Sequence, residues 1–270
     1  MQECPRVALT IAGSDCSAGA GIQADLKTFQ HFHIHGLTAV TCVVSETATI
    51  VRAVHPVPID VLEDQITLMF EAFPIAAVKT GMLFSAAHVA VVAKILANQQ
   101  GGKVVVDPVM IASTGASLLE PDAIALYQSH LLPLATVITP NIPEAEVLLG
   151  ERIPNTTAME AAARRLAKRY GTAVLLKGGH LEGAECLDLL WADGEVSRFS
   201  APRIPLPGSH GTGCTLSAAV TAALALGHPL VEAVAMAKEY LGASLRSSYQ
   251  FLAEGKAPVH ALNQGTLKQD

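Results

Sequence analysis

Short β-branched runs alternate with longer amphipathic segments along most of this chain, and this alternation limits its possible folds more than any other feature. The apolar runs occupy residues 7–12, 38–44, 76–81, 103–107, 136–140 and 173–177. Helical periodicity marks the segments between them, at residues 21–33, 59–73, 85–99, 121–131, 143–149 and 158–170. Continuous apolar runs are typical of strands that are buried on both faces, and repeated strand–helix units form parallel sheets. The pattern predicts an α/β fold with a central, mostly parallel sheet and helices on both faces.

The alternation changes near residue 185. Two β-like runs in "CLDLLWADGEVSRFSAP" (186–202) are separated by Asp193-Gly194, which predicts an antiparallel hairpin at the edge of the sheet. Helices are then predicted over residues 213–226 and 230–249. Because no Pro/Ser-rich linker, charge block or fixed-period repeat divides the chain, we expect one domain over residues 1–270, with a short mobile tail after Gly255.

The composition excludes several classes of protein. With 270 residues, of which 50% are hydrophobic, the chain can bury a large core. A formal charge of −6, without a dense basic cluster, argues against a nucleic-acid partner. The sequence shows neither a leader peptide nor an apolar run long enough for a membrane span, so we expect a cytoplasmic protein without a membrane partner. Five scattered cysteines without a C-x-x-C pair indicate reduced thiols rather than disulfides or a zinc site.

Polar residues directly follow most of the predicted parallel strands. They are Asp15, Thr80-Gly81-Met82, Asp107, Asn141 with Glu144, and Lys177-Gly178-Gly179-His180. Open parallel sheets bind their ligands beyond the carboxyl ends of the strands. The sequence therefore predicts a functional site at this edge of the sheet.

The stretch "HGTGCT" (210–215) places glycines and Cys214 at the start of a predicted helix. Its backbone N–H groups and the helix dipole can hold a phosphate, although a plain glycine-rich cap beside a buried cysteine is the alternative. A helix N-terminus can lower a thiol pKa below about 8.5, so we expect Cys214 to be a partly ionised base that accepts a proton from an alcohol. His210 leaves open a cysteine hydrolase that uses a Cys214–His210 pair.

Three further motifs have both a chemical and a structural interpretation. "GAGIQA" (19–24) matches the dinucleotide fingerprint of a nicotinamide or flavin oxidoreductase, but "GSDCSA" separates it from the preceding strand. Asp107, Asn141 and Glu144 offer oxygen ligands suited to Mg²⁺, while Asn141 and Glu144 also fit a helix cap. Lys177 can reach a nucleotide phosphate, or it can be an ordinary exposed lysine in a turn.

The motifs together resemble a known family. "ALTIAGSDCSAGAGIQADLKT" (8–28), "KTGM" (79–82), "DPVM" (107–110), "TPNIPEAE" (139–146), "LLKGGH" (175–180) and "HGTGCT" resemble the hydroxymethylpyrimidine kinase and phosphomethylpyrimidine kinase family of thiamine biosynthesis. The resemblance covers residues 6–260 and implies a ribokinase-like fold. It also implies a homodimer that uses ATP and Mg²⁺ to phosphorylate 4-amino-5-hydroxymethyl-2-methylpyrimidine, and then the monophosphate to the diphosphate.

The resemblance also implies roles for individual residues. Cys214 is the implied catalytic base, beside an anion hole made by the backbone amides of Gly211, Thr212 and Gly213. The implied cofactor residues are Lys177 for the ATP phosphates and Asp107, Asn141 and Glu144 for Mg²⁺, with Asp107 and Glu144 acting on the metal partly through water. The implied pyrimidine pocket consists of Gly13, Asp25, Glu46, Met82 and Val109.

This chain departs from the family at Glu46-Thr47, where many members have Gln-Asn. An ionised carboxylate only accepts hydrogen bonds, and two buried acceptors facing each other cost about 1–3 kcal/mol. Glu46 could instead accept from the pyrimidine amino group. The alternative function is therefore that of a pyridoxal or pyridoxine kinase, which has the same ribokinase-like fold.

Overall fold

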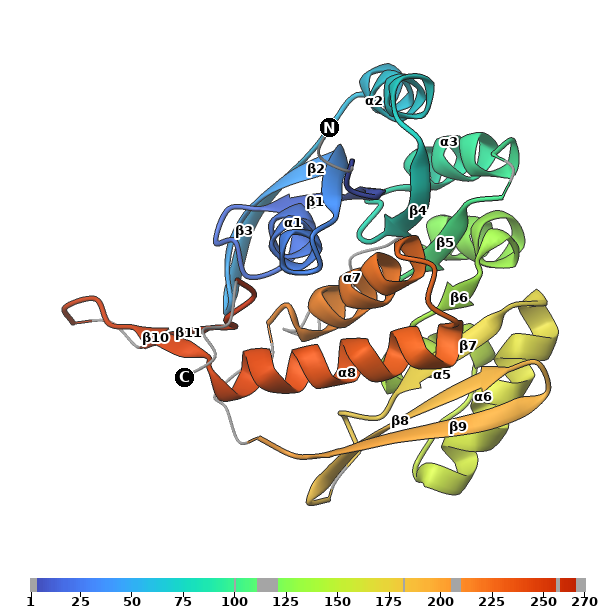
Figure 1. Cartoon of the computed structure of the whole chain (residues 1–270), viewed down its shortest axis with the longest axis vertical. Helices are drawn as coiled ribbons and strands as arrows, with labels where there is room; N and C mark the ends of the chain where they lie inside the picture. Colours follow the sequence, from blue (N-terminus) through green and yellow to red (C-terminus); the bar gives the residue numbers. More distant parts are fainter. Residues whose placement is uncertain are drawn as a thin grey trace.

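A computed structural model describes residues 4–99, 101–110, 121–181, 183–204, 210–255 and 258–265, and nine of its strands form one sheet (Figure 1). The strand order is β3-β2-β1-β4-β5-β6-β7-β8-β9. The six predicted strands are parallel at its centre: β1 (Val7–Asp15), β2 (His35–Thr47), β4 (Ile75–Thr80), β5 (Lys103–Val106), β6 (Val137–Ile138) and β7 (Ala173–Lys177). Their carboxyl ends consequently meet at a common edge, as the alternating pattern predicted.

Antiparallel strands complete both sides of the sheet. β8 (Glu185–Ala192) and β9 (Glu195–Pro202) form the predicted hairpin, and Asp193 and Gly194 both have positive φ, as its tight turn requires. β3 (Ile50–Pro56) pairs with β2 on the opposite side and was not predicted from the sequence. Most of its side chains are exposed, so it lacks the buried apolar pattern by which the other strands were recognised.

Helices cover both faces of the sheet, as predicted. One face carries α1 (Gly21–His31), α7 (Thr212–Ala225) and α8 (Leu230–Arg246), which lie side by side in Figure 1. The other carries α2 (Ile59–Ala72), α3 (Ala86–Ala97), α4 (Pro121–Leu126), α5 (Ile142–Leu149) and α6 (Thr156–Tyr170). In the described parts of the chain, no helix combines the length and apolar character needed to cross a bilayer.

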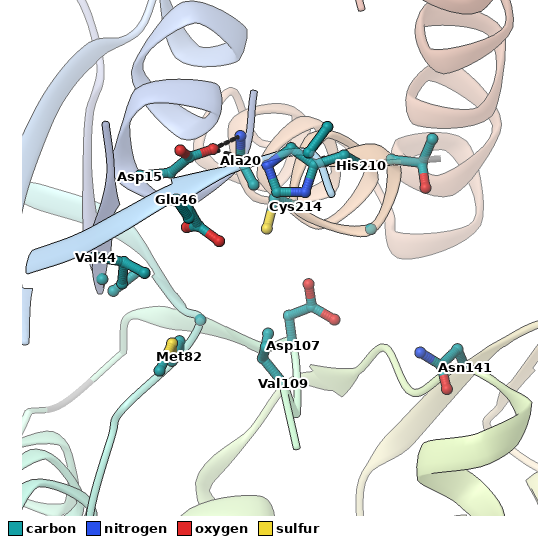
Figure 2. Close-up of a pocket in the computed structure, with 18 of the residues that line it drawn as sticks. Asp15, Ala20, Val44, Glu46, Met82, Asp107, Val109, Asn141, His210 and Cys214 are labelled. Carbon is teal, nitrogen blue, oxygen red and sulfur yellow. Dashed lines mark hydrogen bonds and ion pairs between the residues drawn. The ribbon is translucent and has the colours of Figure 1, made fainter. Parts of the chain in front are cut away.

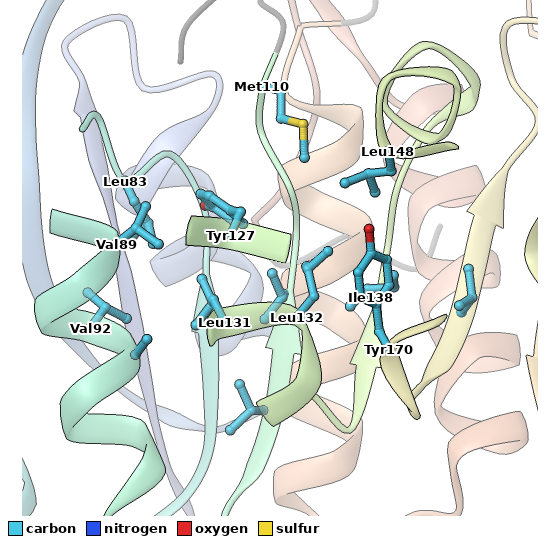
Figure 3. Close-up of a cluster of buried hydrophobic side chains, with 14 of the residues drawn as sticks. Leu83, Val89, Val92, Met110, Tyr127, Leu131, Leu132, Ile138, Leu148 and Tyr170 are labelled. Carbon is cyan, nitrogen blue, oxygen red and sulfur yellow. The ribbon is translucent and has the colours of Figure 1, made fainter. Parts of the chain in front are cut away.

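Alternate residues of the central strands enter separate hydrophobic clusters. Val104 and Val106 point into the larger cluster, whose helical side includes Tyr127 and Leu131 (Figure 3), whereas Val105 packs under α7 and α8. This alternation follows from the period of two in a β-strand and explains why the strands are apolar throughout. The small side chains of Ala219 and Ala223 bring α7 close to the sheet.

The segment that follows α8 contains elements that no sequence pattern indicated. β10 (Tyr249–Phe251) and β11 (Val259–Ala261) form a separate antiparallel pair. Beyond them, Gln264 has an exposed fraction of 1%, and its backbone carbonyl accepts a hydrogen bond from the Tyr240 hydroxyl. Residues 256–257 and 266–270 of the expected tail lie outside the described residues. Leu262 and Gln264 therefore pack against the body of the fold, whereas β10 and the described residues directly after it are exposed.

Candidate active site

A cavity of about 410 Å³ lies at the carboxyl edge of the parallel strands (Figure 2). The ends of β1, β2, β4, β5 and β7 surround it, together with the start of α7. The structure brings together all the predicted site residues except Asp25: Gly13, Glu46, Met82, Asp107, Val109, Asn141, Glu144, Lys177, Gly211, Thr212, Gly213 and Cys214.

The glycine-rich turn at the start of α7 has the geometry of an anion site. Gly211 is the N-cap residue with φ 82°, and a Cβ atom there would lie 1.9 Å from the carbonyl oxygen of Gly19, so only glycine fits. The first backbone N–H groups of a helix lack intrahelical acceptors and carry the positive end of its dipole. A Cβ atom on Gly213 would lie 3.2 Å from Lys177 Nζ, which places a cation beside the turn.

Asp107 and Lys177 form a buried ion pair beside this turn. Lys177 Nζ lies 2.9 Å from Asp107 Oδ1, and the hydroxyls of Thr139 and Ser217 donate to the same carboxylate. Burial opposes both charges, but the mutual attraction outweighs it, so the pKa of Asp107 is lowered and that of Lys177 is raised. The sequence left open that Lys177 is an ordinary exposed lysine in a turn. That alternative is wrong, because the Lys177 side chain is only 13% exposed.

Asn141 and Glu144 form the capping box that their spacing predicted. The Asn141 side chain accepts from the Glu144 N–H at 2.9 Å, and Glu144 Oε2 accepts from the Asn141 N–H at 2.8 Å. Burial, opposed by Lys177 and reinforced by Asp107, raises the pKa of Glu144 to about 7. This buried carboxyl therefore has an unfavourable charge that a cation in the cavity would stabilise.

The described residues contain no group of three or more His, Cys, Asp or Glu side chains arranged to hold a metal directly. Asp107 and Glu144 nevertheless line one cavity, and both are already engaged in hydrogen bonds. Mg²⁺ usually keeps several waters and shares its remaining positions with substrate phosphates. The pair therefore fits a hydrated magnesium ion held through water rather than a cage made only of protein ligands.

Cys214 lies in the first turn of α7, but its ionisation differs from the sequence expectation. Burial raises the pKa of the thiol to about 11, with further increases from Asp25 and Asp107, although Lys79 and the Gly21 N–H lower it. The expectation of a thiol pKa lowered by the helix N-terminus is therefore wrong for the ligand-free chain. Removal of the sulfur from water is the largest influence on this pKa, and it outweighs the lowering by Lys79 and by the Gly21 N–H.

Asp15 organises the loop that faces the glycine-rich turn. Its carboxylate accepts hydrogen bonds from the N–H groups of Ser17, Gly19 and Ala20, and from His210 Nε2 at 2.9 Å. Burial raises the pKa of Asp15, but these hydrogen bonds outweigh it and hold the pKa below its usual range. His210 therefore pairs with Asp15, which leaves the hydrolase hypothesis of a Cys214–His210 pair without geometric support.

The remaining lining residues create a compartment with apolar and acidic walls. Figure 2 shows Val44, Met82 and Val109 on one side of the cavity, with Glu46 above them. Burial, and then the nearby charge of Asp15, raise the pKa of Glu46. A flat polar ring that carries an amino group fits such a compartment, because the apolar side chains contact the ring and a carboxyl group meets its polar edge.

Asp25 is absent from the cavity wall, which corrects its expected contact with a pyrimidine. Its side chain is completely buried, and its oxygens lie 2.7 and 2.8 Å from Lys79 Nζ and 2.6 Å from the Thr10 hydroxyl. Lys79 itself lines the cavity and was missed by the sequence analysis. The signals in the sequence were a lysine inside an apolar strand and its place at the start of the KTGM motif, and neither revealed its distant partner.

Comparisons with known proteins agree with this arrangement. A family model described as phosphomethylpyrimidine kinase matches residues 15–260. A hydroxymethylpyrimidine/phosphomethylpyrimidine kinase of Rhizobium meliloti is 43% identical, over 94% of this chain and 96% of that protein. A thiamine biosynthesis bifunctional protein of Geobacter sulfurreducens is 44% identical over 93% of this chain, and the chain spans about half (51%) of its length.

Solved structures show the same fold. A Bacillus subtilis pyridoxal kinase in complex with ADP has a TM-score of 0.85 and 36% identity, covering 97% of this chain and 98% of that one. A phosphomethylpyrimidine kinase of Clostridium difficile has a TM-score of 0.79 and 39% identity, covering 88% and 98%. Because the family model and a relative of nearly equal length both cover most of the sequence, this chain belongs to the phosphomethylpyrimidine kinase family.

Proposed function

We propose that this kinase uses ATP to phosphorylate 4-amino-5-hydroxymethyl-2-methylpyrimidine, and then its monophosphate, in thiamine biosynthesis. One observation carries the proposal: a helix-start turn, a buried lysine and a thiol line the same cavity as a compartment suited to an aminopyrimidine. Relatives at about 40% identity are named hydroxymethylpyrimidine/phosphomethylpyrimidine kinases, after both phosphorylation steps, and they support this choice of substrates.

In the first step, Cys214 accepts the proton of the hydroxymethyl group while Lys177 and the turn at Gly211–Gly213 hold the transferred phosphoryl group. The alcohol oxygen forms a bond to the γ-phosphorus as the bond to the β–γ bridging oxygen breaks, and ADP leaves. Phosphoryl transfer requires mainly positioning and charge neutralisation, which these groups provide. The thiol must lose its proton before it acts, and the surrounding charges decide how readily this happens.

Asp107 and Glu144 are the proposed residues for Mg²⁺, with Asn141 holding Glu144 in place. When bound, the ion neutralises phosphate charge and aligns the nucleotide. The pKa of about 7 for Glu144 means that this carboxyl is only partly ionised without a cation, so a bound cation would also favour its ionised form.

Gly13, Glu46, Met82 and Val109 form the proposed pyrimidine subsite. Met82 and Val109 give apolar contact to the ring, and a Cβ atom on Gly13 would lie 2.9 Å from Cys42 Sγ and 3.8 Å from Met82 Sδ, so glycine avoids crowding behind Met82. The Glu46 carboxylate accepts a hydrogen bond from the exocyclic amino group. Asp25 is excluded from this proposal because its oxygens are already used by Lys79 and Thr10.

The experiment that tests the function measures ADP formation with hydroxymethylpyrimidine, its monophosphate and pyridoxal side by side. We expect both pyrimidines to be phosphorylated with a higher kcat/KM than pyridoxal. Pyridoxal kinase activity is the second candidate, which the fold similarity to pyridoxal kinases and the presence of Glu46 favour. A higher kcat/KM for pyridoxal would establish that alternative and reject the pyrimidine assignment.

The proposed enzyme is a cytoplasmic homodimer. Exposed apolar side chains support self-association: Phe251 and Leu252, at and just after β10, are 60% and 76% exposed, and Ile50 and Val51 in β3 are 52% and 39% exposed. Sedimentation velocity tests this part of the proposal, and Leu252→Asp is expected to shift the protein toward monomer. A monomeric wild-type protein at micromolar concentration would contradict it.

A further inference from the structure

Lys79 is charged although its strand is buried in the sheet. Its side chain and that of Asp25 both have an exposed fraction of 0%, and Nζ lies 2.7 and 2.8 Å from the two carboxylate oxygens. Burial lowers the pKa of Lys79, but the Asp25 carboxylate, with smaller contributions from Cys214 and Asp107, outweighs burial and raises the pKa. Replacement of buried ion pairs by apolar residues is often neutral for stability, so folding alone does not explain why this pair is here.

The position of the ammonium group links this pair to the candidate active site. Lys79 lines the same cavity as Cys214, and α7 packs directly on β4. A Cβ atom on Gly81 would lie 3.2 Å from Lys79 Nζ, so a larger residue there would crowd the ammonium group. Lys79 and Cys214 each contribute to the electrostatic environment of the other.

We propose that Lys79 is a positioning residue whose fixed positive charge stabilises the Cys214 thiolate, while Asp25 anchors the ammonium group and weakens its effect. This inference rests on the proposed function only in taking Cys214 as the base. The interaction between the two charges is a property of the ligand-free chain, so it can be measured without kinase activity.

Charged groups on several elements influence the ionisation of the Cys214 thiol. They are Lys79 on β4, Asp25 on α1, Asp107 after β5 and Lys177 at the end of β7. The Gly21 N–H, in the first turn of α1, also donates to the sulfur and lowers the thiol pKa. Lys79 lowers the thiol pKa and Asp25 raises it, so removal of one charge has the opposite effect to removal of the other. Lys79 is the larger of the two influences, so we expect the loss of Lys79 to dominate when both are removed.

The test is the pH dependence of Cys214 alkylation by iodoacetamide between pH 6 and 10, followed on the Cys214 peptide by mass spectrometry. Lys79→Met is expected to slow alkylation about tenfold at pH 8, which corresponds to a one-unit increase in thiol pKa. Asp25→Asn is expected to accelerate it severalfold. A role limited to folding would change both variants in the same direction, whereas the electrostatic role changes them in opposite directions.

The double variant Lys79→Met/Asp25→Asn removes both buried charges, so it decides the question if Lys79→Met does not fold. It is expected to react more slowly than wild type and faster than Lys79→Met. The matched control is Lys94→Met, which removes an exposed lysine, and Cys4 is the internal reference thiol. Equal alkylation rates for the double variant and wild type, or a change in alkylation rate in the same direction for both single variants, would overturn the proposal.

The proposed function can fail independently. Failure of the wild type to phosphorylate the pyrimidine, with the alkylation pattern as expected, would reject the proposed function alone.

Discussion

The two proposed phosphorylation steps differ in whether they need Cys214 as a base. The alcohol of the first step must lose a proton, whereas the phosphate acceptor of the second step is already largely ionised at neutral pH, because its second pKa is about 6. A thiol whose pKa is about 11 in the ligand-free cavity is therefore needed in the first step and dispensable in the second.

We expect Cys214→Ala to reduce kcat for the alcohol by about 10²–10⁴-fold, the usual contribution of a general base. For the monophosphate, the expected loss is below about tenfold, because the anion hole and Lys177 remain intact. Separate assays of ADP formation with each acceptor measure the two effects, with Cys186→Ala as a matched control on β8. Equal losses for the two acceptors would show that Cys214 is not a base specific to the alcohol step.

His210 and Asp15 stabilise the folded state in a defined pH range. The Asp15 hydrogen bond raises the pKa of His210 above 6.5, so its contribution is complete below pH 6.5 and is lost as pH rises through the raised value. The pKa of Asp15 is lowered from 3.8, so its contribution is present above pH 3.8 and is lost as pH falls through the lowered value. Together the pair stabilises the fold most between these two limits.

His210→Gln is expected to lower the free energy of unfolding by about 2 kcal/mol at pH 5.5, the usual size for a charge-assisted hydrogen bond. The loss should be smaller at pH 9, where the imidazole of the wild type is neutral. Urea unfolding at both pH values measures the difference, with the exposed His55→Gln as control. A loss that is equal at both pH values would show that the histidine charge does not contribute.

At the level of elements, three segments far apart in sequence meet around the anion turn. Gln264, near the C-terminal end of the described chain, donates from Nε2 to the Gly19 carbonyl at 3.0 Å and to the Thr215 hydroxyl at 2.8 Å. It therefore joins the loop before α1 to the first turn of α7. The family model ends at residue 260, so Gln264 lies outside the residues that this model matches, whereas both of its partners lie inside them.

Gln264→Leu is expected to lower the free energy of unfolding by about 1–3 kcal/mol, because the Gly19 carbonyl and the Thr215 hydroxyl lose a buried donor. We also expect a lower kcat/KM, since the loop before α1 and the first turn of α7 would no longer be joined by this side chain. Chemical denaturation and steady-state kinetics measure these effects, and Asn263→Ala is the neighbouring control. If both variants behave alike, the C-terminal segment does not position the site.

At the level of the whole molecule, the residues that line the cavity lie along one edge of the sheet. A ligand bound there should therefore stabilise the folded state of the whole domain. A ligand present at 100 times its Kd contributes about 2.7 kcal/mol, which corresponds to an increase in Tm of about 5–10 °C for a domain of this size. We expect Mg²⁺ with ADP to raise Tm in this range and NAD to have no effect. Differential scanning fluorimetry makes the comparison, and a response to NAD alone would revive the oxidoreductase interpretation of residues 19–24.

The sequence was a good guide wherever structure depends on neighbouring residues. Asn141 and Glu144 illustrate this, because a capping box needs only residues three positions apart, and their spacing predicted it. The β8–β9 hairpin was predicted for the same reason, from the turn at Asp193-Gly194. Strand β3 was missed because its mostly exposed side chains carry little of the apolar pattern that marks a strand.

By itself, the sequence determined the six parallel strands and the helices between them, the β8–β9 hairpin and the edge of the sheet where the site lies, because local periodicity and turn residues encode them. Only the tertiary structure decided that Asp25 faces Lys79, 54 positions away, that Gln264 reaches Gly19, and that the thiol pKa of Cys214 is raised. Desolvation and charge pairing depend on which distant groups share a buried space. No local pattern records that information.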